Sequence, residues 1–295
     1  MNLKKGNRRF LLLVLVPCFA EVFLFLVLPI IGTCLVSFME YNPLRSQNSF
    51  VGISNYIRLL HDQSFFRAMG NTLVFTFAAV AINIVLALAM AVAISQFESN
   101  RTRSFFRMMV FLPCIAPMVA SAVVWLRSLY EPRGGMFNAL LKAFGLEGIA
   151  WVGDARYLMV SVIIFTLWAD IGYNVILFSA GIDGIPGNLY ESARLDGAGR
   201  WQLFRMITLP LLGRTTTFIL LMTLTSYFQM FAQFQIFAPK EGPQQSGLVM
   251  TGYIYKQAFV NKEMGYAAAI SMALFAVILI VSAVQQRISR VDWEY

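Results

Sequence analysis

The sequence predicts an all-α membrane protein with six transmembrane helices. Of its 295 residues, 58% are hydrophobic and 13% are charged, whereas soluble domains carry about 25% charged residues. The mean hydropathy of +0.67 over the whole chain implies several membrane spans. Helices across about 30 Å of hydrocarbon need about 20 apolar residues. The segments that meet this length are 10–38, 71–97, 105–126, 157–180, 215–237 and 266–285.

The first and third segments carry features of their own. The segment 10–38 follows a basic stretch, but it is far longer than the roughly 7–15 apolar residues of a cleavable signal, so it is expected to remain as a span. In the third segment, Pro113 and Pro117 each lack a backbone N–H, and both are expected to kink the helix.

The distribution of basic residues predicts that both termini lie inside the cell. Lys and Arg are only modestly more frequent in the inner segments, but the inner loop 98–104 is very short, and the positive-inside bias acts in short loops. The expected layout is a cytoplasmic tail at 1–9, a single transmembrane domain at 10–285 and a cytoplasmic tail at 286–295. The net charge of +8 is explained by anchoring beside anionic lipid rather than by nucleic-acid binding.

The motifs of several enzyme classes are absent from the sequence. It contains no phosphate-binding loop, no nucleophile elbow and no zinc-protease helix motif. Cys18, Cys34 and Cys114 lie in apolar runs and indicate neither a disulfide nor a metal site, and His61 is the sole histidine. The chain is therefore expected to be no enzyme and to bind no metal or cofactor itself, so any nucleotide chemistry belongs to a partner.

A charged segment broken by glycines, 182–213, lies between the fourth and fifth spans and is expected inside the cell. Asn188 and Glu191 have the spacing of a capping box, which predicts a helix over 188–195. Whether Glu191 has a functional role is open at this point, because a structural role as a helix cap alone would account for it.

The second half of this segment predicts a turn and another helix. Gly197 and Gly199 can adopt positive φ and reverse the chain. A helix over 200–208 is expected to end before Pro210, which lacks an amide donor. The segment therefore predicts a helix, a turn and a second helix.

The pattern E-x-A-x-x-x-G-x(9)-I-x-L-P in this segment resembles the signature cytoplasmic loop of ABC importer permeases. The resemblance is to the carbohydrate-uptake group related to maltose and glycerol-phosphate permeases, and it covers nearly the whole chain. In that family the loop forms coupling helices that dock into a cleft on the ATPase. Serine at position 192 departs from the usual alanine, and Gly213 stands where a proline often follows, which leaves the entry into the fifth span open. The residues to which the resemblance assigns ATPase coupling are Glu191, Ala193, Asp196, Gly197, Ala198, Ile207 and Pro210.

The resemblance also implies the assembly and its location. It implies a multi-pass protein of a bacterial-type cytoplasmic (inner) membrane that works by alternating access. The implied partners are a second homologous permease, an ATPase dimer that binds ATP and Mg, an extracellular or periplasmic solute-binding protein and a carbohydrate substrate. The alternatives are an ABC permease for a non-sugar solute and an ion-driven secondary transporter, which would need inverted repeats and broken helices.

Two stripes of polar residues lie in the fourth and fifth spans. Amide, carboxylate and aromatic side chains suit a sugar, which presents hydroxyls and apolar C–H faces. The alternative is interhelical hydrogen bonding, worth about 0.6 kcal/mol per contact. The residues expected along a substrate path are Asp170, Tyr173, Asn174, Tyr227, Gln229 and Gln233.

Overall fold

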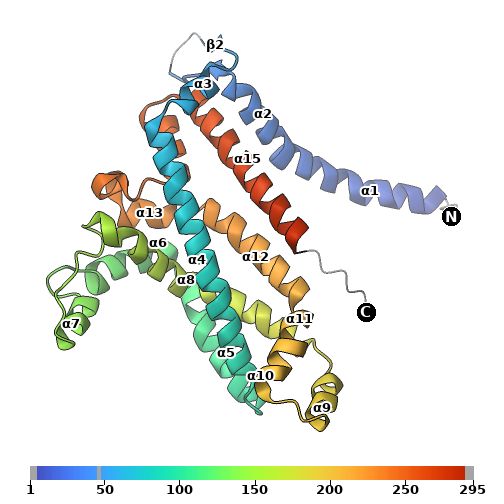
Figure 1. Ribbon diagram of the computed structural model, residues 1–295. Helices are drawn as coiled ribbons and strands as arrows, with labels where there is room; N and C mark the ends of the chain where they lie inside the picture. The colour runs from blue at the N-terminus through green and yellow to red at the C-terminus, as the bar shows by residue number, and fades with distance from the viewer. Residues whose placement is uncertain (1–4, 45–47, 290–295) are drawn as a thin grey trace. The chain divides into compact units, whose positions relative to one another are not determined.

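A computed structural model describes residues 5–44 and 48–289, and almost all of its regular elements are helices (Figure 1). The chain forms two compact units. Unit 1 comprises Met1–Phe65 and Tyr253–Ala276, and unit 2 comprises Phe66–Gly252 and Val277–Tyr295.

The described residues contain four helices that are long and apolar enough to cross a membrane. Two bent helix pairs raise this number to six if each pair forms one span. The helical membrane class predicted from composition is therefore confirmed, with a count of four to six spans. The four helices are Leu13–Ser37, Gln63–Ser95, Ala155–Asp183 and Met264–Ile288, and the pairs are Asn100–Ile115 with Met118–Leu129 and Arg200–Leu211 with Gly213–Phe228.

Unit 1 contains the first long helix and a small antiparallel hairpin in which Met39 lies opposite Phe50. None of the most apolar window of Leu13–Ser37 is buried inside the protein. Its elements are α1 (Lys5–Val22), a π-helical turn (Phe23–Val27), α2 (Leu28–Ser37), β1 (Met39–Glu40), β2 (Ser49–Phe50), α3 (Ser54–Leu60), the start of α4 (Gln63–Ser95), the end of α14 (Met250–Tyr255), a π-helical turn (Lys256–Val260) and the start of α15 (Met264–Ile288).

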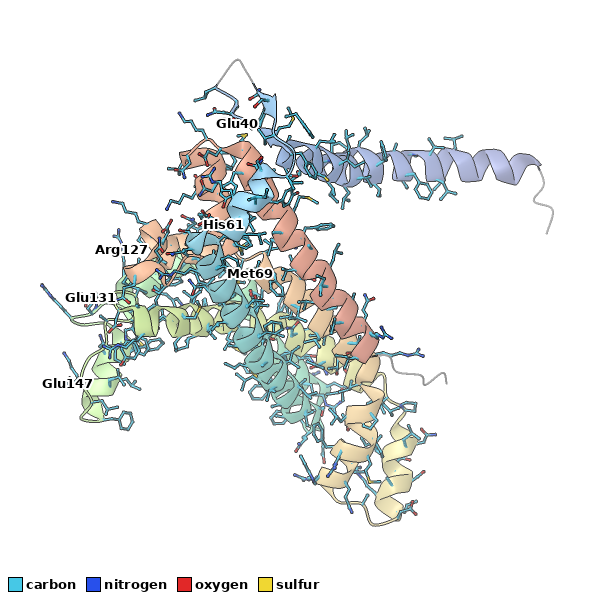
Figure 2. All side chains as sticks on the ribbon, turned by 45° about the horizontal axis from the view of Figure 1, so that its top comes forward. Glu40, His61, Met69, Arg127, Glu131 and Glu147 are labelled. Atoms are coloured by element: carbon cyan, nitrogen blue, oxygen red, sulfur yellow. The ribbon has the colours of Figure 1, made fainter. Side chains whose placement is uncertain are left out.

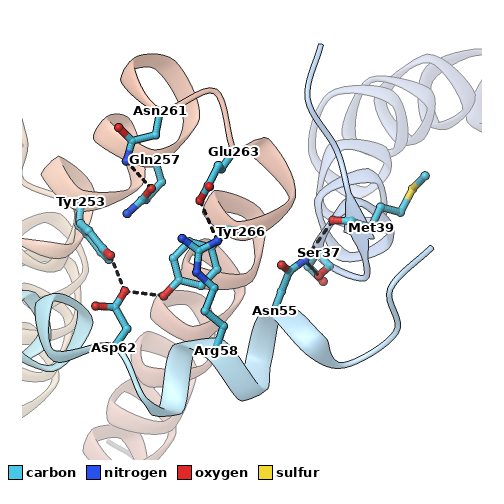
Figure 3. Close-up of polar contacts among 10 residues, drawn as sticks. All are labelled: Ser37, Met39, Asn55, Arg58, Asp62, Tyr253, Gln257, Asn261, Glu263 and Tyr266. Carbon is cyan, nitrogen blue, oxygen red and sulfur yellow. Dashed lines mark hydrogen bonds and ion pairs between the residues drawn. The ribbon is translucent and has the colours of Figure 1, made fainter. Parts of the chain in front are cut away.

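A carboxylate, Asp62, fastens three segments of unit 1 together (Figure 3). It accepts hydrogen bonds from the hydroxyls of Tyr253 and Tyr266, the latter over 2.5 Å. It also caps α4 by accepting from the backbone amides of Ser64 and Phe65, at 2.8 and 3.3 Å. Burial works against ionisation of Asp62, but these four donors outweigh it and hold its pKa below the usual value.

An ion pair lies beside this carboxylate. Arg58 Nη1 is 2.8 Å from Glu263 Oε2, and the Arg58 guanidinium stacks 4.0 Å from the centre of the Tyr266 ring. Burial and the bond to Asp62 raise the pKa of Tyr253 to about 12, so its hydroxyl remains a donor at neutral pH. Sequence reasoning missed the cluster because its members lie far apart in the chain.

Replacing Asp62 by alanine is expected to destabilise unit 1 by about 2 kcal/mol, because α4 loses its cap and two tyrosine hydroxyls lose their acceptor. Asp62→Asn is the matched control, since asparagine also caps helices and accepts hydrogen bonds. The midpoint of thermal unfolding of the purified chain in detergent measures both.

Comparison of the native protein with Asp62→Asn gives a pH dependence of stability with a defined sign. A lowered pKa in the folded state means that ionised Asp62 stabilises the protein fully above the ordinary Asp pKa of about 3.9. This contribution is lost as the pH falls through the lowered, folded-state value. The stability advantage of the native protein over Asp62→Asn should therefore shrink below about pH 4, and an advantage that grows on acidification would contradict the assignment.

Unit 2 holds the rest of α4, with a core built by small and large apolar residues. Ala87 and Ala91 of α4 are fully buried against Phe178 and Ile219. The further elements are α5 (Asn100–Ile115), α6 (Met118–Val124), a π-helical turn (Trp125–Leu129), α7 (Met136–Ala143), α8 (Ala155–Asp183), α9 (Gly187–Leu195), α10 (Arg200–Leu203), a π-helical turn (Phe204–Thr208), α11 (Leu209–Leu211), α12 (Gly213–Phe228), α13 (Ala232–Phe237), two 3-10 turns (Pro239–Glu241 and Pro243–Gln245), the start of α14 and the end of α15.

Polar contacts organise the loops on both sides of α7. Glu131, labelled in Figure 2, accepts from the backbone amides of Arg133 and Gly134 at 3.0 and 2.5 Å. The buried Asn138 of α7 donates to the carbonyl of Ile149 at 2.9 Å and accepts from Trp151 Nε1 at 3.0 Å. These bonds fix the segment that leads into α8.

The third and fifth predicted spans differ from the expectation of continuous helices. The segment 105–126 bends by 90° between α5 and α6, where Ala116 is extended at φ −68°, ψ 137°, as steric contact with Pro117 favours. Pro113 lies inside α5, so the kink expected there is not the site of the bend. The segment 215–237 is interrupted after Phe228 and resumes at Ala232.

Candidate functional site

The charged segment after α8 folds into a helical hairpin, defined here as Gly187–Leu211, in unit 2 (Figure 1). Its first arm is α9. Its second arm runs from α10 through a π-helical turn to α11. The hydroxyl groups of Tyr190 and Thr208 are 2.9 Å apart and join the two arms. The predicted helix, turn and helix are confirmed, whereas this link was not predicted.

The turn of the hairpin involves Ala193, Gly197 and Ala198, three of the residues to which the resemblance assigns ATPase coupling. Gly197 adopts φ +82°, the left-handed conformation that glycine tolerates best. Its amide donates to the carbonyl of Arg194 at 3.0 Å, and the amide of Ala198 donates to Ala193 at 2.9 Å. This pair of hydrogen bonds is a complete Schellman motif, which ends α9 and reverses the chain.

Three details of the hairpin correct the sequence expectations. The capping box at Asn188 and Glu191 is not formed, because α9 begins at Gly187 after Pro186 and places Asn188 inside the helix. Gly199 is extended at φ −75°, ψ 167°, so Gly197 alone reverses the chain. The helix does not end before Pro210, because the arm continues through the π-helical turn Phe204–Thr208 into α11, which contains Pro210.

The second arm changes direction beyond Pro210. Arg200–Leu211 and Gly213–Phe228 meet at an angle of 65°. The buried Leu212 lies at this bend and packs in the core with Phe178 of α8. The hairpin is therefore joined to α12 through a residue that is fixed in the unit 2 core.

A groove of about 780 Å³ separates the hairpin from the ends of α4, α5 and α8. Its walls carry both signs of charge, with Asp183 held by Arg107 at 2.8 Å. The residues that line it are Val92, Ser95, Gln96, Glu98, Arg103, Ile182, Asp183, Ile185, Gly187, Tyr190, Glu191, Arg194, Arg200, Leu203, Phe204 and Thr208.

The hairpin exposes large apolar side chains. Leu195 is 89% exposed, Trp201 68% and Met206 74%. Glu191 and Asp196 are also exposed, whereas Ile207 is half-buried. Large exposed apolar side chains beside charged residues are a feature of protein–protein contact surfaces.

The residues predicted along a substrate path differ in their exposure. Asn174 and Tyr227 are buried, whereas Tyr173 and Gln229 are exposed. Asp170 is half-buried on α8, and Gln233 is buried in α13 beyond the interruption that follows α12. The stripe expected along one continuous fifth helix is therefore divided between two helices.

Asn174 and Tyr227 take part in interhelical hydrogen bonds. Asn174 Nδ2 donates to Asn83 Oδ1 at 2.7 Å and to Thr223 Oγ1 at 3.0 Å. Asn83 Nδ2 in turn donates to the Tyr227 hydroxyl at 2.8 Å. The network joins α4, α8 and α12, as the interhelical alternative predicts for these residues. Asn83 was missed, although an asparagine inside an apolar span is itself a signal.

No group of three His, Cys, Asp or Glu side chains in residues 5–44 and 48–289 is placed to hold a metal ion. The hairpin and its groove offer a contact surface rather than a set of reacting groups. This arrangement is suited to docking of another protein at the end of the helices.

Comparison with known proteins agrees with this geometry. Residues 83–290 match the family described as "Binding-protein-dependent transport system inner membrane component". Probable ABC transporter permease protein YurN of Bacillus subtilis (strain 168) is 33% identical over 278 residues, covering 93% of this chain and 94% of that protein. Arabinooligosaccharides transport system permease protein AraP of the same strain is 30% identical over 273 residues, covering 92% and 86%.

A solved structure shares the fold. It is a chain of a bacterial alginate ABC transporter in complex with an alginate pentasaccharide-bound periplasmic protein, with a TM-score of 0.85, 23% sequence identity and 98% coverage of both chains. Because the family match spans more than half of the sequence, this chain belongs to the binding-protein-dependent transport system inner membrane components, and it is a multi-pass ABC permease subunit rather than an enzyme.

Proposed function

We propose that this chain is a transmembrane subunit of an ABC importer that takes up a sugar, an oligosaccharide or a related polyol. The observation that carries the proposal is the hairpin, which presents Glu191 and exposed apolar side chains beyond the ends of apolar helices. The substrate class is supported by the relative that transports arabinooligosaccharides and by the fold shared with the alginate transporter.

The proposed topology has six spans with both termini in the cytoplasm. Each bent helix pair then counts as one span. The permease domain covers 10–285 between two cytoplasmic tails, and the hairpin lies on the cytoplasmic side within the loop 182–213. This placement agrees with the charged residues that line the groove beside the hairpin, since charged groups avoid the bilayer centre.

The proposed mechanism is alternating access driven by a partner. ATP and Mg bind to an ATPase dimer, whose closure moves the docked hairpin. The Schellman turn at Gly197 and the Tyr190–Thr208 link keep the two arms together. Force then reaches α8 through the short connection at Asp183–Gly187 and reaches α12 through Leu212.

The other partners follow from the same proposal. A second homologous permease completes the path, and an external solute-binding protein delivers the carbohydrate. The exposed Tyr173 and Gln229, the half-buried Asp170 and the buried Gln233 are the proposed path residues in this chain. Asn174 and Tyr227 contribute through the network that positions α8 and α12.

Coexpression with the partner subunits tests the proposal. The chain should co-purify with an ATPase and a sister permease, and a sugar-loaded binding protein should stimulate ATP hydrolysis by the complex. Glu191→Ala should reduce this stimulation by about tenfold, as expected for loss of an interfacial contact worth about 1.4 kcal/mol. Glu147→Ala, in the segment after α7, is the matched control.

Two results would overturn the proposal. One is rapid uptake of maltose or arabinotriose by liposomes that contain this chain alone and an ion gradient. The other is labelling of a cysteine placed at position 197 by an impermeant reagent added outside intact cells.

A further inference from the structure

The segment between α13 and α14 concentrates unfavourable backbone conformations. Lys240, Glu241, Gln244 and Gln245 adopt φ values of 55°, 73°, 52° and 58°. Side chains with a Cβ atom rarely occupy this left-handed region, because the Cβ approaches the following carbonyl oxygen. Lys262 is the other non-glycine residue with positive φ in the part of the chain that the structure describes. The segment 239–247 is called the left-handed loop below.

The left-handed loop is held by two side chains of α4 that lie one turn apart in unit 2. Arg67 Nη1 donates to the carbonyl of Gln244 at 3.2 Å and to Gln245 Oε1 at 3.1 Å. Asn71 Nδ2 donates to the carbonyls of Gln245 and Leu248 at 3.0 and 2.9 Å. Positions four residues apart share one helix face, so the two side chains act on the same stretch of backbone.

The underside of the loop is closely packed. A Cβ atom at Gly247 would lie 2.2 Å from the Cβ of Ala238 and 3.0 Å from Leu158 of α8. The amide of Met250 donates to Thr72 Oγ1 of α4 at 2.9 Å. In contrast, Lys240 and Gln244 are exposed. The loop can therefore change conformation toward solvent, but it cannot sink further.

The opposite end of α4 reaches the groove beside the hairpin. Val92 and Ser95 line that groove, and Ile94 packs in the core that contains Leu212. Asn71 and Ser95 are about 36 Å apart along the axis of an α-helix. Figure 1 shows α4 as one uninterrupted helix, so a shift at the groove moves Arg67 and Asn71 as well.

We propose that Arg67 and Asn71 are positioning residues that latch the left-handed loop onto α4, and that displacement of α4 during transport releases the loop to a less strained backbone. The second half of this statement rests on the proposed function, because the transport cycle supplies the displacement. Strained backbone persists only where neighbouring contacts enforce it, and here those contacts come from the helix that reaches the groove. Release also couples the two ends of α4 reciprocally, so the state of the loop biases the hairpin.

Hydrogen exchange of the assembled transporter in lipid nanodiscs tests the latch. Arg67→Ala should accelerate exchange of the amides of Gln245 and Gly247 at least tenfold, with little change in the core of α8. Arg67→Lys, which keeps the charge but loses the planar fork, should give an intermediate rate. Unchanged exchange in Arg67→Ala would overturn the latch.

Glycine substitutions separate strain from ordinary packing. Adding Lys240→Gly and Gln244→Gly to Arg67→Ala should slow exchange again, because glycine occupies the left-handed region without penalty. Ser246→Gly is the matched control, since Ser246 has a right-handed φ of −66° and its replacement relieves no strain. Equal effects of the control and the double glycine change would overturn the role of strain.

The link to transport has its own readout. Exchange in the left-handed loop of the native complex should differ at least tenfold between the nucleotide-free state and a state trapped with Mg-ATP and vanadate. Equal exchange in both states would overturn the coupling to α4. Uptake of maltose or arabinotriose by the native complex is measured separately, so failure of the proposed function is distinguishable from failure of the latch.

Discussion

Replacing Gly197 by valine is expected to reduce ATP-driven uptake by the assembled transporter about tenfold or more. The left-handed conformation at φ +82° costs residues with a Cβ about 1–2 kcal/mol, and β-branched residues suffer most. The turn would relax to another backbone and lose the bond between Ala198 and Ala193 that closes it. The two arms would then no longer move as one body. Uptake of a radiolabelled sugar into proteoliposomes, with immunoblotting for chain level, measures this loss.

Gly197→Asn is the matched control for this effect. Beyond Gly197 and its two chain neighbours, no atom lies within 4 Å of a Cβ built at this position, so a side chain meets no obstacle from the rest of the fold. Asparagine enters the left-handed region more readily than other residues with a Cβ. The asparagine protein should therefore retain most of the uptake, and an equal loss in both proteins would contradict the conformational explanation.

Two helical glycines of unit 2 are expected to respond to alanine with opposite signs. A Cβ at Gly172 of α8 would lie 2.3 Å from the carbonyl oxygen of Val110 and 2.8 Å from Cα of Phe111. Both atoms belong to the backbone of α5, so α5 and α8 must separate. Gly172→Ala should destabilise the chain by about 3 kcal/mol, at the upper end of the range for overpacking.

Gly70 of α4 provides the comparison, because no atom beyond its chain neighbours and the nearby backbone of its own helix lies within 4 Å of its added Cβ. Glycine inside a helix is about 1 kcal/mol less favourable than alanine, so Gly70→Ala should stabilise the chain by up to that amount. Denaturation of each purified protein by SDS, followed by circular dichroism, gives both changes. Destabilisation of similar size at the two positions would show that the close contact of α5 and α8 is not the cause.

Local signals allowed the hairpin to be predicted from the sequence, but its boundaries were predicted incorrectly. A chain reversal through positive φ favours glycine, and Gly197 at φ +82° meets this requirement. A single residue type therefore indicated the turn. The start of α9 was misplaced because both Pro186 and Asn188 are acceptable near a helix N-terminus. The end at Pro210 was misplaced because proline was expected to break the helix, whereas the arm continues through a π-helical turn, Phe204–Thr208, and past Pro210.

Contacts between distant parts of the chain were beyond the sequence reasoning. Arg67 and Gln244 are separated by 177 positions, and Asp62 and Tyr266 by 204. Nothing in the local pattern around either partner indicates the other. The polar stripe of the fourth span was detected, but its role was not. Periodicity placed Asn174 on one helix face without indicating whether that face contacts substrate or another helix.

The π-helical turn at Phe204–Thr208 has a consequence for comparing this chain with its relatives. Such a turn accommodates one residue more than an α-helical turn over about the same rise. Deleting one residue there would restore ordinary winding and leave the flanking segments in place. Homologous permeases that differ by a single insertion or deletion in this arm can therefore keep the same docking end and the same membrane entry, and their alignments should carry the gap inside this turn.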